Sequence, residues 1–168
     1  GLGGDYEDGK LRYERVIIMT DADVDGAHIA SLLMTFFYRE MPGLIENGHL
    51  FLAQPPLYRL SQGGKVMYAR DDAHKDELLK SDFNGRGKVE ISRFKGLGEM
   101  PAMQLKDTTM HPGKRTLWRV VIPDRAQEEQ RGEARETAQL VESLMGRKPE
   151  LRFAYIQENA KFARDLDV

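Results

Sequence analysis

The chain has 168 residues, of which 40% are hydrophobic and 31% are charged, as in an ordinary folded domain. It contains no cysteine, which excludes disulfide bonds, thiol catalysis and cysteine-ligated zinc. The formal net charge is −2, so no overall basic field indicates a nucleic-acid partner, although a local basic patch would suffice. The longest strongly apolar stretch, residues 29–37, is too short to span a bilayer, and we expect no membrane partner.

The first eight residues are rich in glycine and acid and lack periodicity, which predicts a loop. Residues 16–20 are an unbroken run of apolar and β-branched side chains, which predicts a fully buried strand. A strand this early needs partners that the preceding dozen residues cannot supply. We therefore expect that the chain was cut from a longer polypeptide on its N-terminal side.

Three aspartates at alternate positions follow the strand, namely Asp21, Asp23 and Asp25, and Gly26 comes next. Ligands bind in open α/β sheets where strands end, and carboxylates this close repel one another unless a cation or protons intervene. Hard oxygen ligands suit Mg²⁺, with Mn²⁺ or Ca²⁺ as substitutes. The pattern predicts a divalent-metal site. The plain alternative is a turn in which Asp25 caps the next helix, but a cap accounts for only one aspartate.

Three kinds of chemistry use acidic loops of this type. An EF-hand requires glutamate at the twelfth loop position, where this chain has Leu32, and a helix before the loop. An aspartyl-phosphate phosphatase has a strand ending in D-x-D-G, which residues 23–26 fit loosely, with Asp23 as the nucleophile. The third is a Mg²⁺ site for phosphodiester chemistry, in which metal stabilises the attacking and leaving oxygens.

Apolar residues recur at three- and four-residue steps from Ile29 to Met41, which predicts an amphipathic helix of about 14 residues. A further helical turn begins at Pro42, and residues 49–53 predict a second strand. Strand, helix and strand form a βαβ unit, which implies a parallel sheet. The remaining elements that we expect are a hairpin at 56–60 and 65–69, helices at 71–80, 101–109, 128–145 and 151–166, and strands at 89–94 and 115–122.

Other residues could contact phosphate. Gly96 and Gly98 beside Lys95 would let the backbone approach a phosphate closely while the lysine supplies charge; the alternative is a plain turn between a strand and a helix. Arg59 is either a phosphate contact or a surface charge. His28, at the start of the predicted helix, is either a phosphate contact, a general acid or base, or a structural hydrogen-bonding residue.

Four segments, in order, resemble the Toprim domain and C-terminal end of bacterial type IIA topoisomerase B subunits. They are T-D-A-D-V-D-G-A-H-I within residues 16–37, A-Q-P-P-L-Y at 53–58, R-F-K-G-L-G-E-M at 93–100, and F-A-Y-I-Q-E-N-A at 153–160. Together they extend over nearly the whole chain. Ala27 and residues 30–35 are more similar to topoisomerase IV than to DNA gyrase, which is the nearest alternative.

The resemblance implies an α/β fold: a Toprim-like parallel sheet with flanking helices, plus a small α+β tail. Residues 1–60 would be the C-terminal part of the Toprim domain, and residues 61–168 the family-specific tail. It implies an ATP-dependent DNA topoisomerase, an isomerase of the bacterial cytoplasm and nucleoid that relaxes and decatenates double-stranded DNA. A tyrosine of the partner A subunit attacks a DNA phosphate within an A2B2 heterotetramer, and the B subunit supplies the metal half of the site.

The resemblance also assigns residues by motif. The catalytic and Mg²⁺-binding residues would be Asp21, Asp23 and Asp25. The DNA-binding residues would be Lys95, Gly96, Gly98, Arg59 and His28. The family's other catalytic acid, a glutamate in an E-G-D-S-A stretch, has no counterpart here, and ATP binds only in the missing N-terminal domain. We therefore expect that the isolated chain binds metal weakly and neither cleaves DNA nor hydrolyses ATP. The rival classes are the phosphatase and a non-catalytic interaction piece.

Overall fold

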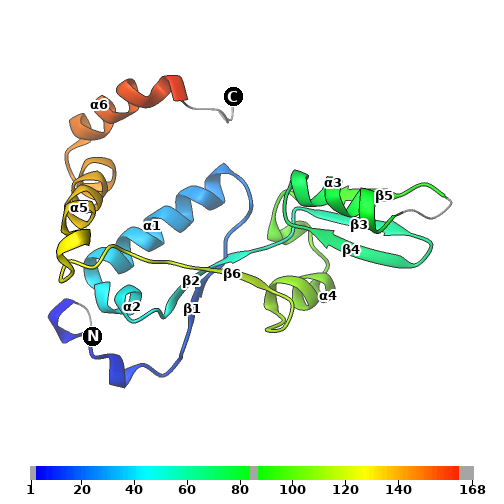
Figure 1. Ribbon diagram of the computed structural model, residues 1–168, viewed down its shortest axis with the longest axis horizontal. Coiled ribbons are helices and arrows are strands. Elements are labelled where there is room, and N and C mark those ends of the chain that lie inside the picture. The colour runs from blue at the N-terminus through cyan, green and yellow to red at the C-terminus, as the bar shows by residue number, and fades with distance from the viewer. Residues whose placement is uncertain (1–2, 84–86, 163–168) are drawn as a thin grey trace. The chain divides into compact units, whose positions relative to one another are not determined.

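The computed structural model describes residues 3–83 and 87–162 (Figure 1). The fold is mixed α/β, as predicted. The chain forms two compact units, one comprising Gly1–Val16, Ser31–Leu50 and Arg119–Val168 and the other Ile17–Ala30 and Phe51–Trp118. Within the described residues, no helix is both long and apolar enough to cross a membrane.

The first sheet has the strand order β1-β2-β6, and most of its residues belong to the second unit. Its strands are β1 (Val16–Ile18), β2 (Leu50–Gln54) and β6 (Thr116–Arg119). Because β1, a helix and β2 follow one another and the two strands are neighbours, the predicted strand–helix–strand unit is present. The expectation of a fully buried first strand is wrong, since β1 lies at the sheet edge and only Ile18 is buried.

Helix α1 (Val24–Glu40) has 17 residues and begins earlier than predicted. Asp23 precedes it as the cap: its Oδ1 accepts the Gly26 N–H at 2.7 Å, and its carbonyl accepts the Ala27 N–H at 3.0 Å. The alternative in which Asp25 caps this helix is therefore wrong, because Asp25 lies within the first turn. A second helix, α2 (Pro42–Glu46), begins at Pro42 as predicted.

The second sheet, in the order β4-β3-β5, is antiparallel throughout and belongs to the second unit. Its strands are β3 (Tyr58–Gln62), β4 (Lys65–Ala69) and β5 (Glu90–Arg93). Gly63 and Gly64 have φ values of 56° and 86°, a left-handed pair that closes the predicted hairpin. Helix α3 (Asp72–Ser81) begins after Asp71, which accepts the His74 N–H at 2.7 Å.

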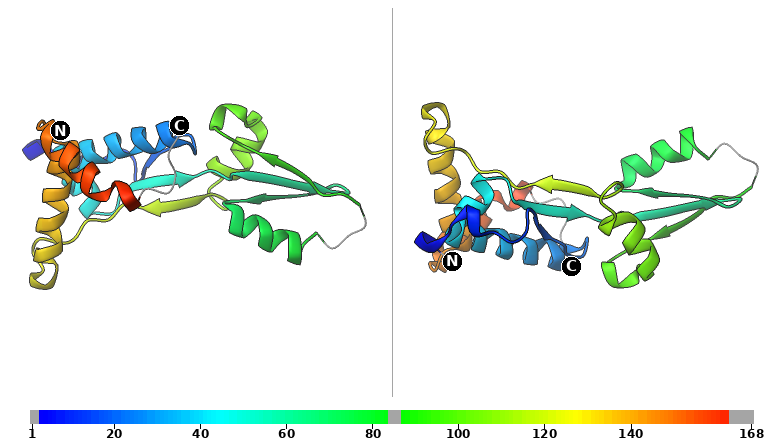
Figure 2. Two further views of the ribbon diagram at one scale, coloured as in Figure 1. Left: turned by 90° about the horizontal axis from the view of Figure 1, so that it is seen from above. Right: turned by 90° about the horizontal axis from the view of Figure 1, so that it is seen from below.

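Alternation along β3 and β4 gives this sheet two chemically different faces. One face builds the core of the second unit, in which α3 contributes Leu78 against Leu60 and Ala69. The other face carries Arg59 and Tyr68, which are direct neighbours across the two strands. Both views in Figure 2 show α3 and α4 (Ala102–Leu105) on opposite sides of these strands. Helix α4 continues as a π-helical turn, Lys106–Met110.

The first unit is largely helical and includes α5 (Arg131–Met145) and α6 (Pro149–Asn159). Arg39 Nη2 of α1 forms an ion pair with Glu142 Oε2 of α5 at 2.7 Å. Gly146 ends α5 as predicted; residues 163–166 of the last expected helix lie outside the described residues. Short 3₁₀ turns occupy Gly3–Asp5, Asp8–Lys10, Leu97–Glu99, Glu128–Gln130 and Ala160–Phe162.

An acid–histidine network joins the N-terminal segment of the first unit to the end of α2. Asp8 Oδ1 accepts hydrogen bonds from Tyr6 Oη at 2.7 Å and Asn47 Nδ2 at 3.0 Å, and lies 3.2 Å from His49 Nε2. The Tyr6 bond is the main cause that lowers the pKa of Asp8. A bond to the Glu14 carbonyl, followed by the Asp8 carboxylate, raises the pKa of His49. Burial and the Asp8 bond raise the pKa of Tyr6 to about 12.

Candidate functional site

Two of the three predicted aspartates line one cavity. Asp21 and Asp23 face a space of about 280 Å³ in the second unit, together with Gln54, Arg70 and other residues. Asp25 does not line it and is exposed in the first turn of α1. Within the part of the chain that the structure describes, no three His, Asp or Glu side chains form a group that could hold a metal. We call this space the acidic cavity.

The Asp21 carboxylate rests against residues 95–99, which we call the glycine turn. The Leu97 N–H donates to Asp21 Oδ1 at 2.7 Å, across 76 residues of sequence. A Cβ added to Gly96 would lie 2.9 Å from Asp21 Cγ and 3.0 Å from Oδ2. Since Gly96 has an extended φ of −156°, glycine is needed here for space and not for backbone conformation. The structure thus brings the aspartate motif and the glycine turn together.

A second glycine fixes the backbone of Asp21. A Cβ on Gly26 would lie 2.0 Å from the Asp21 carbonyl oxygen, so the first turn of α1 crosses the backbone of Asp21 too closely for any side chain. The Gly26 N–H also donates to Asp23 Oδ1 at 2.7 Å. The glycine after the three aspartates therefore allows the close approach that positions the first two.

The other predicted residues are placed differently. The Lys95 N–H donates to Glu99 Oε2 at 2.8 Å and closes the glycine turn, whereas a Cβ on Gly98 would meet no atom within 4 Å. His28 is exposed on α1. Arg59 does not line the acidic cavity but a second, larger one on the β3–β4 face.

Two residues line both cavities: Gln54, which stands in the family-like segment 53–58 without an assigned role, and Arg70, which the sequence did not single out. Gln54 ends β2 and Arg70 follows β4. Neither stands in a spacing that marks a ligand or a phosphate contact. The motif around Gln54 was the one signal in the sequence, and only the course of the strands brings Arg70 to these cavities.

The donor set of the acidic cavity fits a hard divalent cation. Asp21 and Asp23 each use one carboxylate oxygen to accept a backbone N–H, and the other oxygen of each makes no hydrogen bond within residues 3–83 and 87–162. Mg²⁺ is commonly bound through one or two carboxylates, with waters and substrate phosphates completing its octahedron. Two aspartates with free oxygens are therefore a sufficient protein contribution to such a site.

Comparisons with known proteins agree with the resemblance seen in the sequence. Residues 6–55 match the family model of the Toprim domain, and residues 86–157 match that of the DNA gyrase B subunit, carboxyl terminus. The B subunit of DNA topoisomerase 4 from Bartonella bacilliformis is 64% identical over 100% of this chain, and that from Caulobacter vibrioides is 66% identical over 99%. The B subunit of DNA gyrase from Halalkalibacterium halodurans is 47% identical over 100%. The chain spans 23%, 23% and 25% of these three proteins respectively.

Proposed function

Because the chain belongs to the family of bacterial type IIA topoisomerase B subunits, we propose that it forms the metal- and DNA-binding half of the site that cleaves and rejoins DNA in an ATP-dependent topoisomerase. The observation that carries this proposal is the hydrogen bond from the Leu97 N–H to Asp21 Oδ1, which joins the acidic cavity to the glycine turn. The Asp21 and Asp23 carboxylates, which can bind a cation, thereby lie beside the glycine turn, whose backbone N–H groups can bind a phosphate.

Asp21 and Asp23 would hold Mg²⁺, or Mn²⁺ or Ca²⁺ as substitutes, through their free oxygens, with Asp25 outside the direct ligands. When bound, the ion neutralises the charge that develops on the attacking and leaving oxygens during phosphoryl transfer. The Leu97 N–H and the α1 cap keep the two carboxylates in place without the ion. The residues that we place beside the DNA backbone are Lys95, Gly96, Gly98, Arg59 and His28.

The partners that we propose are double-stranded DNA and an A subunit that carries the nucleophilic tyrosine, in an A2B2 assembly in the bacterial cytoplasm and nucleoid. The remaining catalytic glutamate and the ATP site would come from segments that these 168 residues do not contain. On this basis the isolated chain is inactive. We also propose that the Toprim part of the chain comprises residues 1–60 and the family-specific tail residues 61–168.

We favour topoisomerase IV over DNA gyrase, the alternative within the family, since identity is 64% and 66% to the first and 47% to the second. The phosphatase alternative predicts that Asp23 is the phosphorylated nucleophile. One oxygen of Asp23 is engaged as the cap of α1, and the two family models that match are those of the Toprim domain and the DNA gyrase B carboxyl terminus. A phosphatase would hydrolyse p-nitrophenyl phosphate as the isolated chain and trap phosphate on Asp23, and we expect neither.

The test replaces the matching segment of the Caulobacter vibrioides protein with this chain and reconstitutes the enzyme with its A subunit. We expect Mg²⁺-dependent DNA cleavage, relaxation and decatenation. Asp21→Asn and Asp23→Asn should each lower cleavage about 100-fold or more, because several kcal/mol of charge stabilisation depend on the ion. Asp25→Asn should have a weaker effect. Near-normal cleavage by a folded Asp23→Asn enzyme would refute the assignment.

A further inference from the structure

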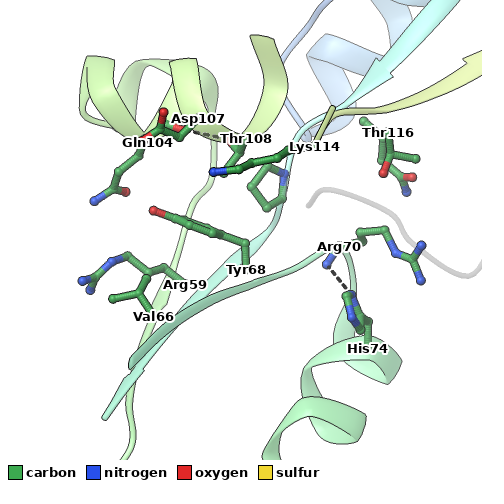
Figure 3. A pocket seen from close by; sticks show the side chains of 12 residues that line it. Arg59, Val66, Tyr68, Arg70, His74, Gln104, Asp107, Thr108, Lys114 and Thr116 are labelled. Carbon is green, nitrogen blue, oxygen red and sulfur yellow. Dashed lines mark hydrogen bonds between the residues drawn. The ribbon is translucent and has the colours of Figure 1, made fainter. Parts of the chain in front are cut away.

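A second cavity, of about 590 Å³, lies on the β3–β4 face that carries Arg59 and Tyr68 (Figure 3). We call it the basic cavity. Lys114, from the segment before β6, and Tyr68 both line it, and Arg70 lies near the start of α3 (Figure 3). Four separate segments of the second unit, within residues 54–59, 66–74, 104–108 and 114–116, thus supply its walls.

Positive charge in the basic cavity is not neutralised. Its lining includes three cationic residues, Arg59, Arg70 and Lys114, and one acidic residue, Asp107. None of the three cations forms an ion pair within residues 3–83 and 87–162, and the one side-chain bond of Arg59 runs from Nη1 to the Ser61 hydroxyl at 3.3 Å. Guanidinium and ammonium groups without carboxylate partners are the usual donors to phosphate oxygens.

Two neutral groups add donors. His74 Nδ1 accepts the Arg70 backbone N–H at 3.3 Å, and since an amide N–H can only donate, the ring proton lies on Nε2, which is left as a donor. Gln104 Oε1 is buried and has no hydrogen-bond partner in the part of the chain that the structure describes. A buried polar atom without a partner marks a place where a ligand or water belongs, and the NH₂ of the same amide is a donor.

The basic cavity adjoins the acidic cavity, because Gln54 and Arg70 line both. An anion with several phosphates could therefore occupy both at once, whereas an isolated phosphate could not. We propose that the basic cavity binds a backbone phosphate further along the DNA strand whose reacting phosphate occupies the acidic cavity. This inference rests on the proposed function and adds Arg70, Lys114, His74 and Gln104 to the DNA-binding residues.

The test measures binding by the full chain to a short fluorescein-labelled duplex in EDTA, so that no metal and no cleavage contribute. We expect that Arg70→Gln combined with Lys114→Gln weakens binding about tenfold or more and lowers the slope of log affinity against log salt by about two between 50 and 200 mM. Lys106→Gln, an exposed lysine of the adjacent π turn that does not line the cavity, is the matched control and should stay within about twofold.

Nuclear magnetic resonance of the same chain separates the two sources of phosphate. The duplex should shift the signals of Arg70 and Lys114, and inorganic phosphate should shift them only at much higher concentration. A shift with phosphate but not with the duplex overturns the DNA assignment, and unchanged affinity and salt slope in the double variant overturn the site itself. If the double variant does not fold, Arg70→Gln and Lys114→Gln are tested singly. Each should then lower the slope of log affinity against log salt by about one. If the enzyme that carries this chain as its segment fails to cleave DNA, the binding and resonance results on the isolated chain are not affected. The proposed function and the proposed phosphate site can therefore be refuted independently.

Discussion

Replacing Gly96 with alanine would press a methyl group against the carboxylate that we propose holds the metal. The added Cβ would lie 2.9 Å from Asp21 Cγ and 3.0 Å from Oδ2, where ordinary contact begins at 3.4 Å. Alanine adopts the extended backbone of Gly96, with φ of −156° and ψ of 170°, without strain. The carboxylate must therefore retreat by about half an ångström, while the glycine turn keeps its conformation.

The retreat weakens the hydrogen bond from the Leu97 N–H to Asp21 Oδ1, now 2.7 Å long. Bonds to a charged group contribute about 1.5–3 kcal/mol, and loss of a group that orients a metal ligand lowers metal affinity about 10–100-fold. Since the hydrogen bond is displaced and not removed, we expect a loss of metal affinity at the lower end of this range, about tenfold. The Mg²⁺ concentration for half-maximal cleavage should rise about tenfold, and saturating Mg²⁺ should restore most of the rate.

The assay is a Mg²⁺ titration of DNA cleavage by the reconstituted enzyme that carries this chain as its segment. Gly98→Ala is the matched control, because it adds the same methyl group to the same turn where no atom lies within 4 Å. We expect its Mg²⁺ midpoint to stay within about twofold of the unaltered enzyme. An unchanged midpoint in Gly96→Ala, or an equal shift in both variants, would refute the role of the turn in holding Asp21.

Three further predictions concern stability, measured by urea unfolding of the full chain. Gly26→Ala should cost about 3 kcal/mol, the upper end for overpacking, because its Cβ would lie 2.0 Å from the Asp21 carbonyl oxygen; a variant as stable as its parent would contradict this. Leu60→Ala, at a side chain with 0% exposure, should cost about 2–5 kcal/mol, and a loss below about 1 kcal/mol would show that this core collapses around the gap. The raised pKa of His49 predicts stability that is complete below about pH 6.5 and is lost as pH rises through the folded value; the lowered pKa of Asp8 predicts stability that is lost as pH falls below about 4. Asp8→Asn should remove the loss of stability at acid pH and reduce the loss of stability as pH rises through the His49 pKa. Identical pH profiles of stability for the unaltered chain and Asp8→Asn would contradict the network.

Local elements were predictable where one residue type determines the backbone. Gly63 and Gly64 adopt the two positive φ values that a tight hairpin requires. An aspartate cap for α3 was indicated by residue type, with Asp71 and Asp72 both open, and the structure selects Asp71. The start of α1 was not predictable in this way. Asp23 and Asp25 are equally good caps by residue type, and only the path of the chain past Asp21 selects the first.

The acidic cavity was partly predictable, and the basic cavity was not. The resemblance placed the glycine turn near the aspartates, although no local pattern connects residues 76 positions apart. Arg59 and Tyr68 meet because the hairpin register pairs them, which follows from the turn. That Arg70 and Lys114 join them depends on how α4 and the segment before β6 pack over the sheet, and such long-range placement leaves no periodic trace in the sequence.

The contacts around Asp21 rank the three aspartates by how firmly each is held. Asp21 has one glycine against its carbonyl and another against its carboxylate, and the Leu97 N–H binds one oxygen. Asp23 is held by one cap bond, and Asp25 lies in the first turn of α1 outside the acidic cavity. A ligand that is already ordered loses less side-chain entropy when an ion binds. Asp21 should therefore contribute most to metal affinity, Asp23 less and Asp25 least, and this order follows from the packing of two glycines and not from the spacing of the acids.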